Sequence, residues 1–130
     1  MKLLVHNMLS SKFLKGVQKG YPLKIIADKT EMKSQEFSAD FIKRMVPKLD
    51  WQAFKSTADS LDMGAELPVT LPEEGSEGYW EANDDFLKGV HKLLLELEIT
   101  EGFLECPETG RKFPIKNGIP NMLANDDEVN

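Results

Sequence analysis

The sequence predicts an α+β protein in which a small antiparallel β lobe, built from both ends of the chain, carries an inserted helical lobe. Apolar residues recur at helical spacing only in the middle of the chain, whereas short extended runs separated by turn signals follow residue 97. Another extended run lies near the N-terminus. We therefore assign residues 1–36 and 98–125 to the β lobe, residues 37–97 to the helical lobe and residues 126–130 to an acidic tail.

The helical lobe is expected to hold three helices. Ser38, Asp50 and Asn83 each precede an apolar run, and their side chains can accept a hydrogen bond from the first helical turn. Pro47 ends the first helix because its ring clashes with a continued helix, and Gly64 ends the second. The apolar faces comprise Phe41, Ile42, Met45 and Val46, then Trp51, Phe54, Ala58 and Leu61, then Phe86, Val90, Leu93, Leu94 and Leu97.

The β lobe is indicated by turn residues between apolar runs. Asn117-Gly118 predicts a type I′ hairpin, because both central residues of that turn need positive φ. A three-stranded C-terminal meander needs a second layer, which the N-terminal strand and a short helix within residues 2–11 would supply. The expected strands are residues 21–27, 99–106, 111–116 and 119–123.

Charge and composition limit the class of protein. The net charge is −6, but residues 1–35 carry +5 and residues 36–97 carry −7, which indicates either two surfaces with different partners or two solvated faces. No apolar run is long enough for a membrane helix or forms the core of a signal peptide, so we expect no membrane partner. The single cysteine excludes an internal disulfide and favours a reducing compartment, the cytoplasm or the nucleus.

Residues that carry catalytic chemistry are sparse. His6 and His91 lack metal-binding spacing, and no glycine-rich phosphate loop or methyl-donor motif is present. Cys106 is followed by Pro107 and is interpreted as a small buried hydrophobe rather than a nucleophile. An acidic run lacks the ligand spacing of a calcium loop and is interpreted as solvated. That run comprises Glu73, Glu74, Glu77, Glu81, Asp84 and Asp85.

Pro120 marks a sheet edge. It lies in the strand-like run of residues 119–123, and proline cannot donate to a β ladder, so this strand is expected at the border of the sheet. An exposed edge bearing Ile119, Met122 and Leu123 favours aggregation unless another segment covers it. Either a second protein adds a strand there, or the acidic tail or N-terminal segment of this chain covers the edge.

Four segments resemble the tRNA methyltransferase activator family, the multifunctional methyltransferase subunit of eukaryotes and archaea. The C-terminal signature is LECPETGRKFPIKNGIPNML, residues 104–123. The other three are MKLLVHN at residues 1–7, VPKLDW at residues 46–51 and HKLLLE at residues 91–96. The likeness follows the same order along nearly the whole chain.

The resemblance implies a zinc-knuckle-like β lobe and a non-catalytic subunit that stabilises and activates Rossmann-like methyltransferases, bound one at a time as heterodimers. Those enzymes would bind S-adenosylmethionine themselves and modify tRNA, 18S ribosomal RNA and a translation termination factor, so RNA is reached only through the partner. Pairing of strand to strand is implied at the edge that Pro120 marks. The expected partner-binding residues are Phe113, Ile115, Gly118, Ile119, Pro120, Asn121, Met122 and Leu123.

The chain departs from the zinc-containing members of that family. Where those members carry four cysteines, this sequence has Ser11, Gly16, Cys106 and Thr109. One thiolate cannot supply a closed tetrahedral site, so we expect no zinc and no other cofactor. Apolar packing would then hold the β lobe, with Phe113, Ile115, Leu23 and Ile25 as its core.

Two other classes of function compete with the activator. A stand-alone RNA-binding adaptor is disfavoured by the net charge of −6 and by the few aromatic residues near the lysines. An enzyme that uses Cys106 as its nucleophile has no base placed nearby by the sequence. The identity and relative affinities of the methyltransferase partners do not follow from the sequence.

Overall fold

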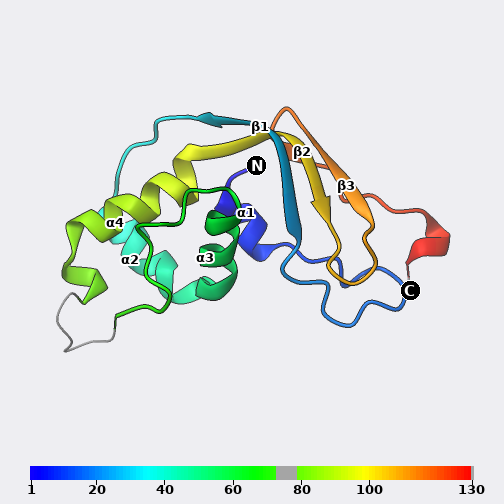
Figure 1. Ribbon diagram of the computed structural model, residues 1–130, viewed down its shortest axis with the longest axis horizontal. Coiled ribbons are helices and arrows are strands. Elements are labelled where there is room, and N and C mark those ends of the chain that lie inside the picture. Colours follow the sequence, from blue (N-terminus) through cyan, green and yellow to red (C-terminus); the bar gives the residue numbers. More distant parts are fainter. Residues whose placement is uncertain (73–78, 130) are drawn as a thin grey trace. The chain divides into compact units, whose positions relative to one another are not determined.

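A computed structural model describes residues 1–72 and 79–129. Its contacts divide the chain into two compact units, one formed by Met1–Glu31 with Glu98–Asn130 and the other by Met32–Leu97 (Figure 1). The expected helical lobe, residues 37–97, thus begins later than the observed unit and ends at the same residue. Glu73, Glu74 and Glu77 of the acidic run lie outside the described residues.

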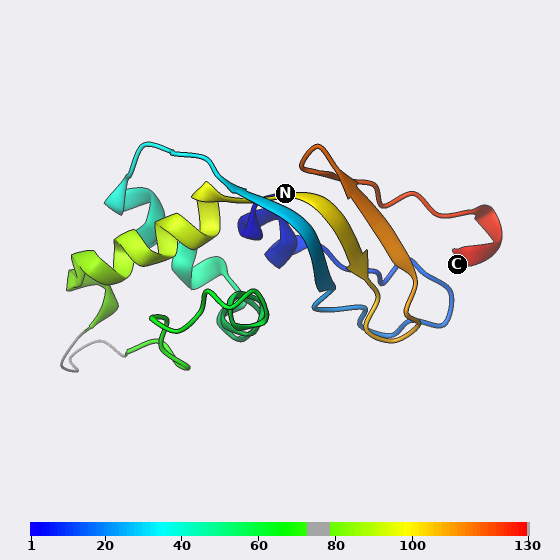
Figure 2. The same cartoon turned by 45° about the horizontal axis from the view of Figure 1, so that its top comes forward.

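The first unit is built on a four-stranded sheet in the order β1-β2-β3-β4. The central strand β2 lies between β1 and β3 (Figure 2). β2 and β3 pair antiparallel, with Leu104 opposite Phe113, and β4 continues the antiparallel pairing. The strands are β1 Lys24–Met32, β2 Leu97–Glu105, β3 Lys112–Lys116 and β4 Ile119–Pro120.

Two strand predictions need correction. The N-terminal strand lies later than the expected residues 21–27, because pairing with β2 rather than local composition determines where it ends. The expected strand at residues 119–123 is reduced to Ile119–Pro120. The hairpin before it is confirmed, since Asn117 has φ +52° and Gly118 φ +77°.

Alternate residues of the sheet form the core of this unit. Phe113 and Ile115 are 0% and 1% exposed, and they pack with the buried side chains of Leu104, Leu23 and Ile25. A short helix, α1 (Leu3–Met8), adds Leu3, His6 and Asn7 to the buried set. His6 Nε2 lies 2.7 Å from Leu23 O, and burial lowers the pKa of the imidazole against the opposing effect of that hydrogen bond.

The second unit is helical, as expected. It contains α2 (Ala39–Met45), α3 (Trp51–Ser60) and α4 (Asp84–His91), and α4 continues as a π-helical turn over Lys92–Glu96. All three predicted N-caps are confirmed: Ser38 accepts from Phe41 N, Asp50 from Ala53 N and Asn83 from Phe86 N. The buried side chains include Ile42, Val46, Phe54, Ala58, Val90, Leu94 and Leu97, together with Leu87, which was not expected.

The predicted helix ends are correct only in part, because α3 ends at Ser60, with Asp62 at φ +60°, rather than at the expected Gly64. α2 ends at Met45 and gives way to a 3₁₀ turn over Val46–Lys48 that contains Pro47. Within residues 1–72 and 79–129, no helix is both long and apolar enough to cross a membrane.

Candidate protein-binding edge

β4 forms one border of the sheet, and its backbone geometry follows from the ladder. Ile115 lies opposite Pro120 and Lys116 opposite Ile119, while Asn121 N donates to Pro114 O at 2.9 Å. Hydrogen-bonded and non-hydrogen-bonded pairs alternate in an antiparallel ladder, so the Pro120 backbone faces away from β3. Because proline has no N–H, the outward-facing group at this position is a carbonyl acceptor. This border can therefore accept a hydrogen bond from another strand at Pro120.

Large apolar side chains remain exposed along this border. Ile119 is 70% exposed and Leu123 is 79% exposed. Gly118, Pro120 and Met122 are half-buried. Asn121 is exposed, and its Oδ1 accepts from Leu123 N at 3.0 Å, which holds the segment after β4 in a turn-like bend. Ile119 and Leu123 thus provide most of the apolar surface that a partner would cover.

Phe113 and Ile115 were expected among the partner-binding residues, and their burial corrects that expectation. Both side chains point into the core of the unit and have no surface to offer a docked protein. The Phe113 ring lies 5.7 Å from Phe13 and 4.8 Å from the Arg111 guanidinium. They support β3, on which β4 is paired, rather than touching a partner.

Phe103 adds exposed apolar surface that the sequence prediction missed. It is 37% exposed and lies opposite Pro114 in the β2–β3 register, on the face of the sheet away from Leu104 and Phe113. Lys116 and Ile119 lie on the same outer face as Pro114, because side chains alternate along each strand. The alternation of residues in β2 is the signal that would have identified Phe103.

Val5 and Met8 on α1 are also exposed, at 43% and 56%. The start of this helix is anchored beside the β3–β4 hairpin, because the Met1 ammonium bonds Glu98 Oε2 at 2.9 Å and a Cβ at Gly118 would lie 3.3 Å from Met1 N. Val5 and Met8 are three residues apart, which is the spacing of neighbours on one face of a helix. They form a second exposed apolar pair in this unit.

The C-terminal segment was one of two internal candidates for covering the edge, the other being the N-terminal segment, and its contacts lie elsewhere. Lys15 N donates to Glu128 O at 2.7 Å, and Arg111 Nε lies 3.1 Å from Glu128 Oε2. Leu14 and Val129 form an isolated antiparallel bridge. The segment expected as an acidic tail is thus held on the loop before β1 and the start of β3, and it leaves Ile119 and Leu123 exposed.

The positions that correspond to zinc ligands do not fit a metal. Ser11 and Cys106 are buried, at 0% and 1% exposure, and Thr109 N donates to Cys106 Sγ at 3.4 Å. Burial raises the pKa of the Cys106 thiol, but hydrogen bonds from Ser11, Thr109 and Glu108 outweigh burial, so the pKa is lowered. No cluster of three ligating side chains occurs among the described residues. A single sulfur with hydroxyl neighbours lacks the donor set that zinc requires.

The Glu108 carboxylate links the segment between β2 and β3 to the loop before β1. Glu108 accepts hydrogen bonds from the backbone N–H groups of Gln18 and Lys19, both at 3.0 Å, and of Gly20 at 2.6 Å. These bonds lower the pKa of the Glu108 carboxyl, since they stabilise its charged form. No role was predicted for Glu108 from the sequence. Its partners lie about ninety positions away, which no local pattern indicates.

The two histidines have structural hydrogen bonds within their own units. His91 Nε2 lies 3.1 Å from Gln35 O, and the ring packs edge-on against Phe37 with centroids 5.3 Å apart. His6 bonds the Leu23 carbonyl, as described above. Neither imidazole is placed against a nucleophile in the part of the chain that the structure covers.

Comparison with known proteins gives one family. The model of the family described as "Trm112p-like protein" matches residues 2–118. The chain is 46% identical over 130 residues to the "Multifunctional methyltransferase subunit TRM112-like protein" of Bos taurus, covering 99% of this chain and 98% of the relative. It is 46% identical over 129 residues to TRM112 homolog A of Arabidopsis thaliana, covering 99% and 100%, and 35% identical over 130 residues to TRM112 of Saccharomyces cerevisiae, covering 95% and 96%.

A solved structure has a similar fold. It is described as the E. cuniculi Mtq2–Trm112 complex responsible for the methylation of the eRF1 translation termination factor. The matching chain superposes with a TM-score of 0.51 at 17% sequence identity, covering 95% of both chains. This likeness confirms the predicted α+β fold.

Proposed function

Because the chain belongs to the Trm112p-like family, we propose that it is a non-catalytic subunit that binds and activates methyltransferases. The relatives from cattle, Arabidopsis and yeast are named as methyltransferase subunits, and they align with this chain over almost its whole length. The observation that carries the proposal is the β4 border, where a backbone acceptor and two exposed apolar side chains lie together.

The proposed contact adds a strand of the enzyme to the free side of β4. An N–H of the partner strand would donate to the Pro120 carbonyl, and flanking apolar residues of the enzyme would cover Ile119 and Leu123. Phe103 on the outer sheet face would lie at the rim of the contact. An enzyme that complements this border would otherwise expose its own apolar patch, so we expect it to depend on the subunit for solubility.

The expected partners, their targets, the location in the cell and the absence of zinc form part of the same proposal. Several S-adenosylmethionine-dependent, Rossmann-like enzymes would compete for one border, and their binding would therefore be mutually exclusive. Their targets would be tRNA, 18S ribosomal RNA and a termination factor, in the cytoplasm and the nucleus. The subunit would contain no zinc, and the methyl donor and RNA would be bound by the enzyme.

Affinity purification from cells tests the proposal. The tagged wild-type chain should retain methyltransferases that mass spectrometry identifies, whereas Leu123→Glu and Met122→Glu should lose them, since each change places a carboxylate in an apolar contact. Val69→Glu is the matched control, because Val69 is 75% exposed in the other unit. Retention of the enzymes by both edge variants would refute the proposed contact. The absence of any methyltransferase from the wild-type sample would refute the proposed function.

A further inference from the structure

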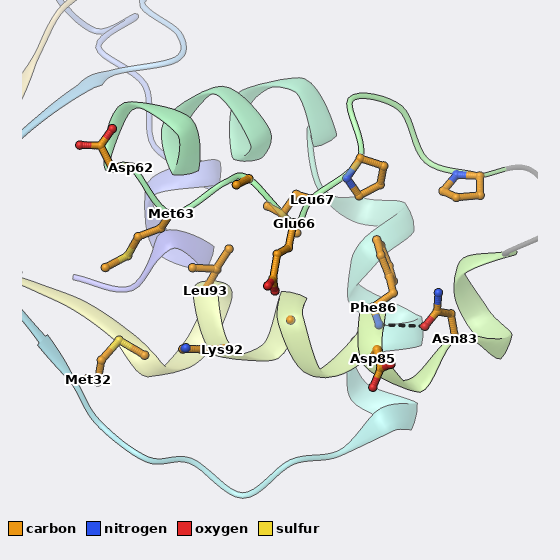
Figure 3. Close-up of a pocket in the computed structure, with 14 residues that line it drawn as sticks. Met32, Asp62, Met63, Glu66, Leu67, Asn83, Asp85, Phe86, Lys92 and Leu93 are labelled. Carbon is orange, nitrogen blue, oxygen red and sulfur yellow. Dashed lines mark hydrogen bonds between the residues drawn. The ribbon is translucent and has the colours of Figure 1, made fainter.

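The second unit carries a groove that the proposed function does not use. It has a volume of about 870 Å³ and lies between the segment that follows α3 and one side of α4 (Figure 3). Figure 3 shows Glu66 reaching from that segment toward α4, with Leu93 and Phe86 on either side. The groove is within the size range of sites that enclose a few side chains of a ligand.

The floor and walls of the groove are apolar. Leu67 and Leu93 are buried, at 6% and 8% exposure, and Phe86 is half-buried. At its open side, Met32 and Met63 remain 48% and 40% exposed. Methionine side chains adapt their shape to different ligands and are common on surfaces that accept several partners. These exposed methionines indicate a surface that a protein segment covers.

The charged side chains of the groove are predominantly acidic. Asp62, Glu66 and Asp85 line it, against Lys92 as a cation. Within the described ranges, none of the three carboxylates has an ion pair or a side-chain hydrogen bond. They also do not converge on one point, since no described group of three ligating side chains is close enough to hold a metal ion. Separate, unpaired carboxylates suit several basic side chains of a ligand, whereas they repel the phosphates of a nucleic acid.

Gly89 provides independent evidence for a ligand. It lies inside α4 and lines the groove, although glycine is the least favourable residue for a helix interior apart from proline. A Cβ at Gly89 would meet nothing within 4 Å, so packing inside this chain gives no reason for a glycine there. The missing side chain instead keeps space open along the groove for close approach of another backbone.

We propose that this groove binds a basic, amphipathic peptide segment of a protein partner. Leucine- or phenylalanine-type residues of that segment would lie between Leu67, Leu93 and Phe86. Its lysine or arginine side chains would pair with Asp62, Glu66 and Asp85. The groove lies wholly in the second unit, so this proposal does not depend on the methyltransferase contact at β4.

The full-length chain can be tested with defined probes. A fluorescein-labelled 16-residue peptide of repeated Leu-Lys-Lys-Leu serves as the basic probe and a Leu-Glu-Glu-Leu peptide as its acidic counterpart. Fluorescence anisotropy should detect binding of the basic peptide alone, weakening as salt screens the charges. Equal binding of both peptides, or direct binding of a fluorescein-labelled single-stranded RNA that Glu66→Lys strengthens, would overturn the proposal.

Two variants separate the groove from general charge effects. Gly89→Leu should weaken binding of the basic peptide at least tenfold while the melting temperature stays the same or rises, because leucine favours a helix and fills the groove. Glu66→Lys should weaken binding about fivefold or more. Glu36→Lys makes the same change of net charge at an exposed residue that does not line the groove, and should have little effect.

The outcomes are distinct from those for the β4 border. Unchanged peptide affinity in Gly89→Leu, or equal losses in Glu66→Lys and Glu36→Lys, would refute the groove as the binding site. Gly89→Leu should still co-purify with methyltransferases, because the β4 border belongs to the other unit. Failure of the groove proposal would therefore leave the proposed function standing, and the reverse also holds.

Discussion

Truncating the two exposed side chains at the β4 border should weaken methyltransferase binding without unfolding the chain. Complete burial of an isoleucine or leucine side chain contributes about 1.5–3 kcal/mol. Ile119 and Leu123 are still 70% and 79% exposed, so most of that contribution is available to a partner. Removing both side chains beyond Cβ should cost about 2–4 kcal/mol of binding free energy, a factor of about 30 to 1,000 in Kd.

A subunit-exchange assay measures this loss directly. A methyltransferase is purified with a wild-type chain that carries a C-terminal fluorescent tag, and unlabelled Ile119→Ala/Leu123→Ala chain is added as competitor. The shift of the displacement midpoint relative to wild-type competitor gives the ratio of dissociation constants. Urea unfolding of the variant alone should change by no more than about 0.5 kcal/mol, because neither side chain packs in the core.

The control is Val69→Ala, which removes an equally exposed apolar side chain from the other unit. It should compete like the wild type. If the double variant also competes within about threefold of the wild type, the two side chains contribute less than about 1 kcal/mol to the binding free energy. Ile119 and Leu123 would then remain in water in the complex, and the edge contact would be incorrect.

Three further predictions concern the first unit. Glu108→Gln should lower the melting temperature at pH 7. This difference from wild type should shrink as the pH falls through the lowered pKa of Glu108, because the carboxylate contributes stability only while ionised. A difference in melting temperature that persists in acid would mean that the charge of Glu108 plays no part. Gly102→Ala should lower the free energy of unfolding in urea by at least about 3 kcal/mol, since its Cβ would lie 2.1 Å from Ile26 O at φ +151°. The control Gly110→Ala, at φ +76° in open space, should lower it by about 1–2 kcal/mol. Equal losses in the two variants would contradict the close approach of Gly102 to Ile26. Elemental analysis should find no stoichiometric zinc, and a chelator should leave the melting temperature unchanged. One zinc per chain would contradict the inference that Cys106 and its hydroxyl neighbours cannot hold the metal.

Interactions between near neighbours in the chain were predictable. Ser38, Asp50 and Asn83 cap their helices through bonds to an N–H three residues later, and a short stretch of sequence contains both partners. The Asn117-Gly118 hairpin follows in the same way from the φ preferences of two adjacent residues. Pro120 at the border follows from its missing donor.

Predictions failed where the answer depended on a distant segment. Phe113 and Ile115 were expected both in the core and in the partner contact, but side chains on one face of a strand cannot serve both. The end of β1 depends on its pairing with β2, and the length of β4 depends on where the chain leaves β3.

The amino-acid sequence alone was sufficient to determine the α+β class, the helix starts, the final hairpin and a proline-marked border, because each depends on local backbone preference or on the period of apolar residues. Only the tertiary structure decided that Glu108 joins Gln18–Gly20, that the C-terminal segment leaves β4 uncovered, and that a glycine in α4 borders an acidic groove. Those features bring together residues far apart in the chain, and their geometry follows from packing that no short window of sequence contains.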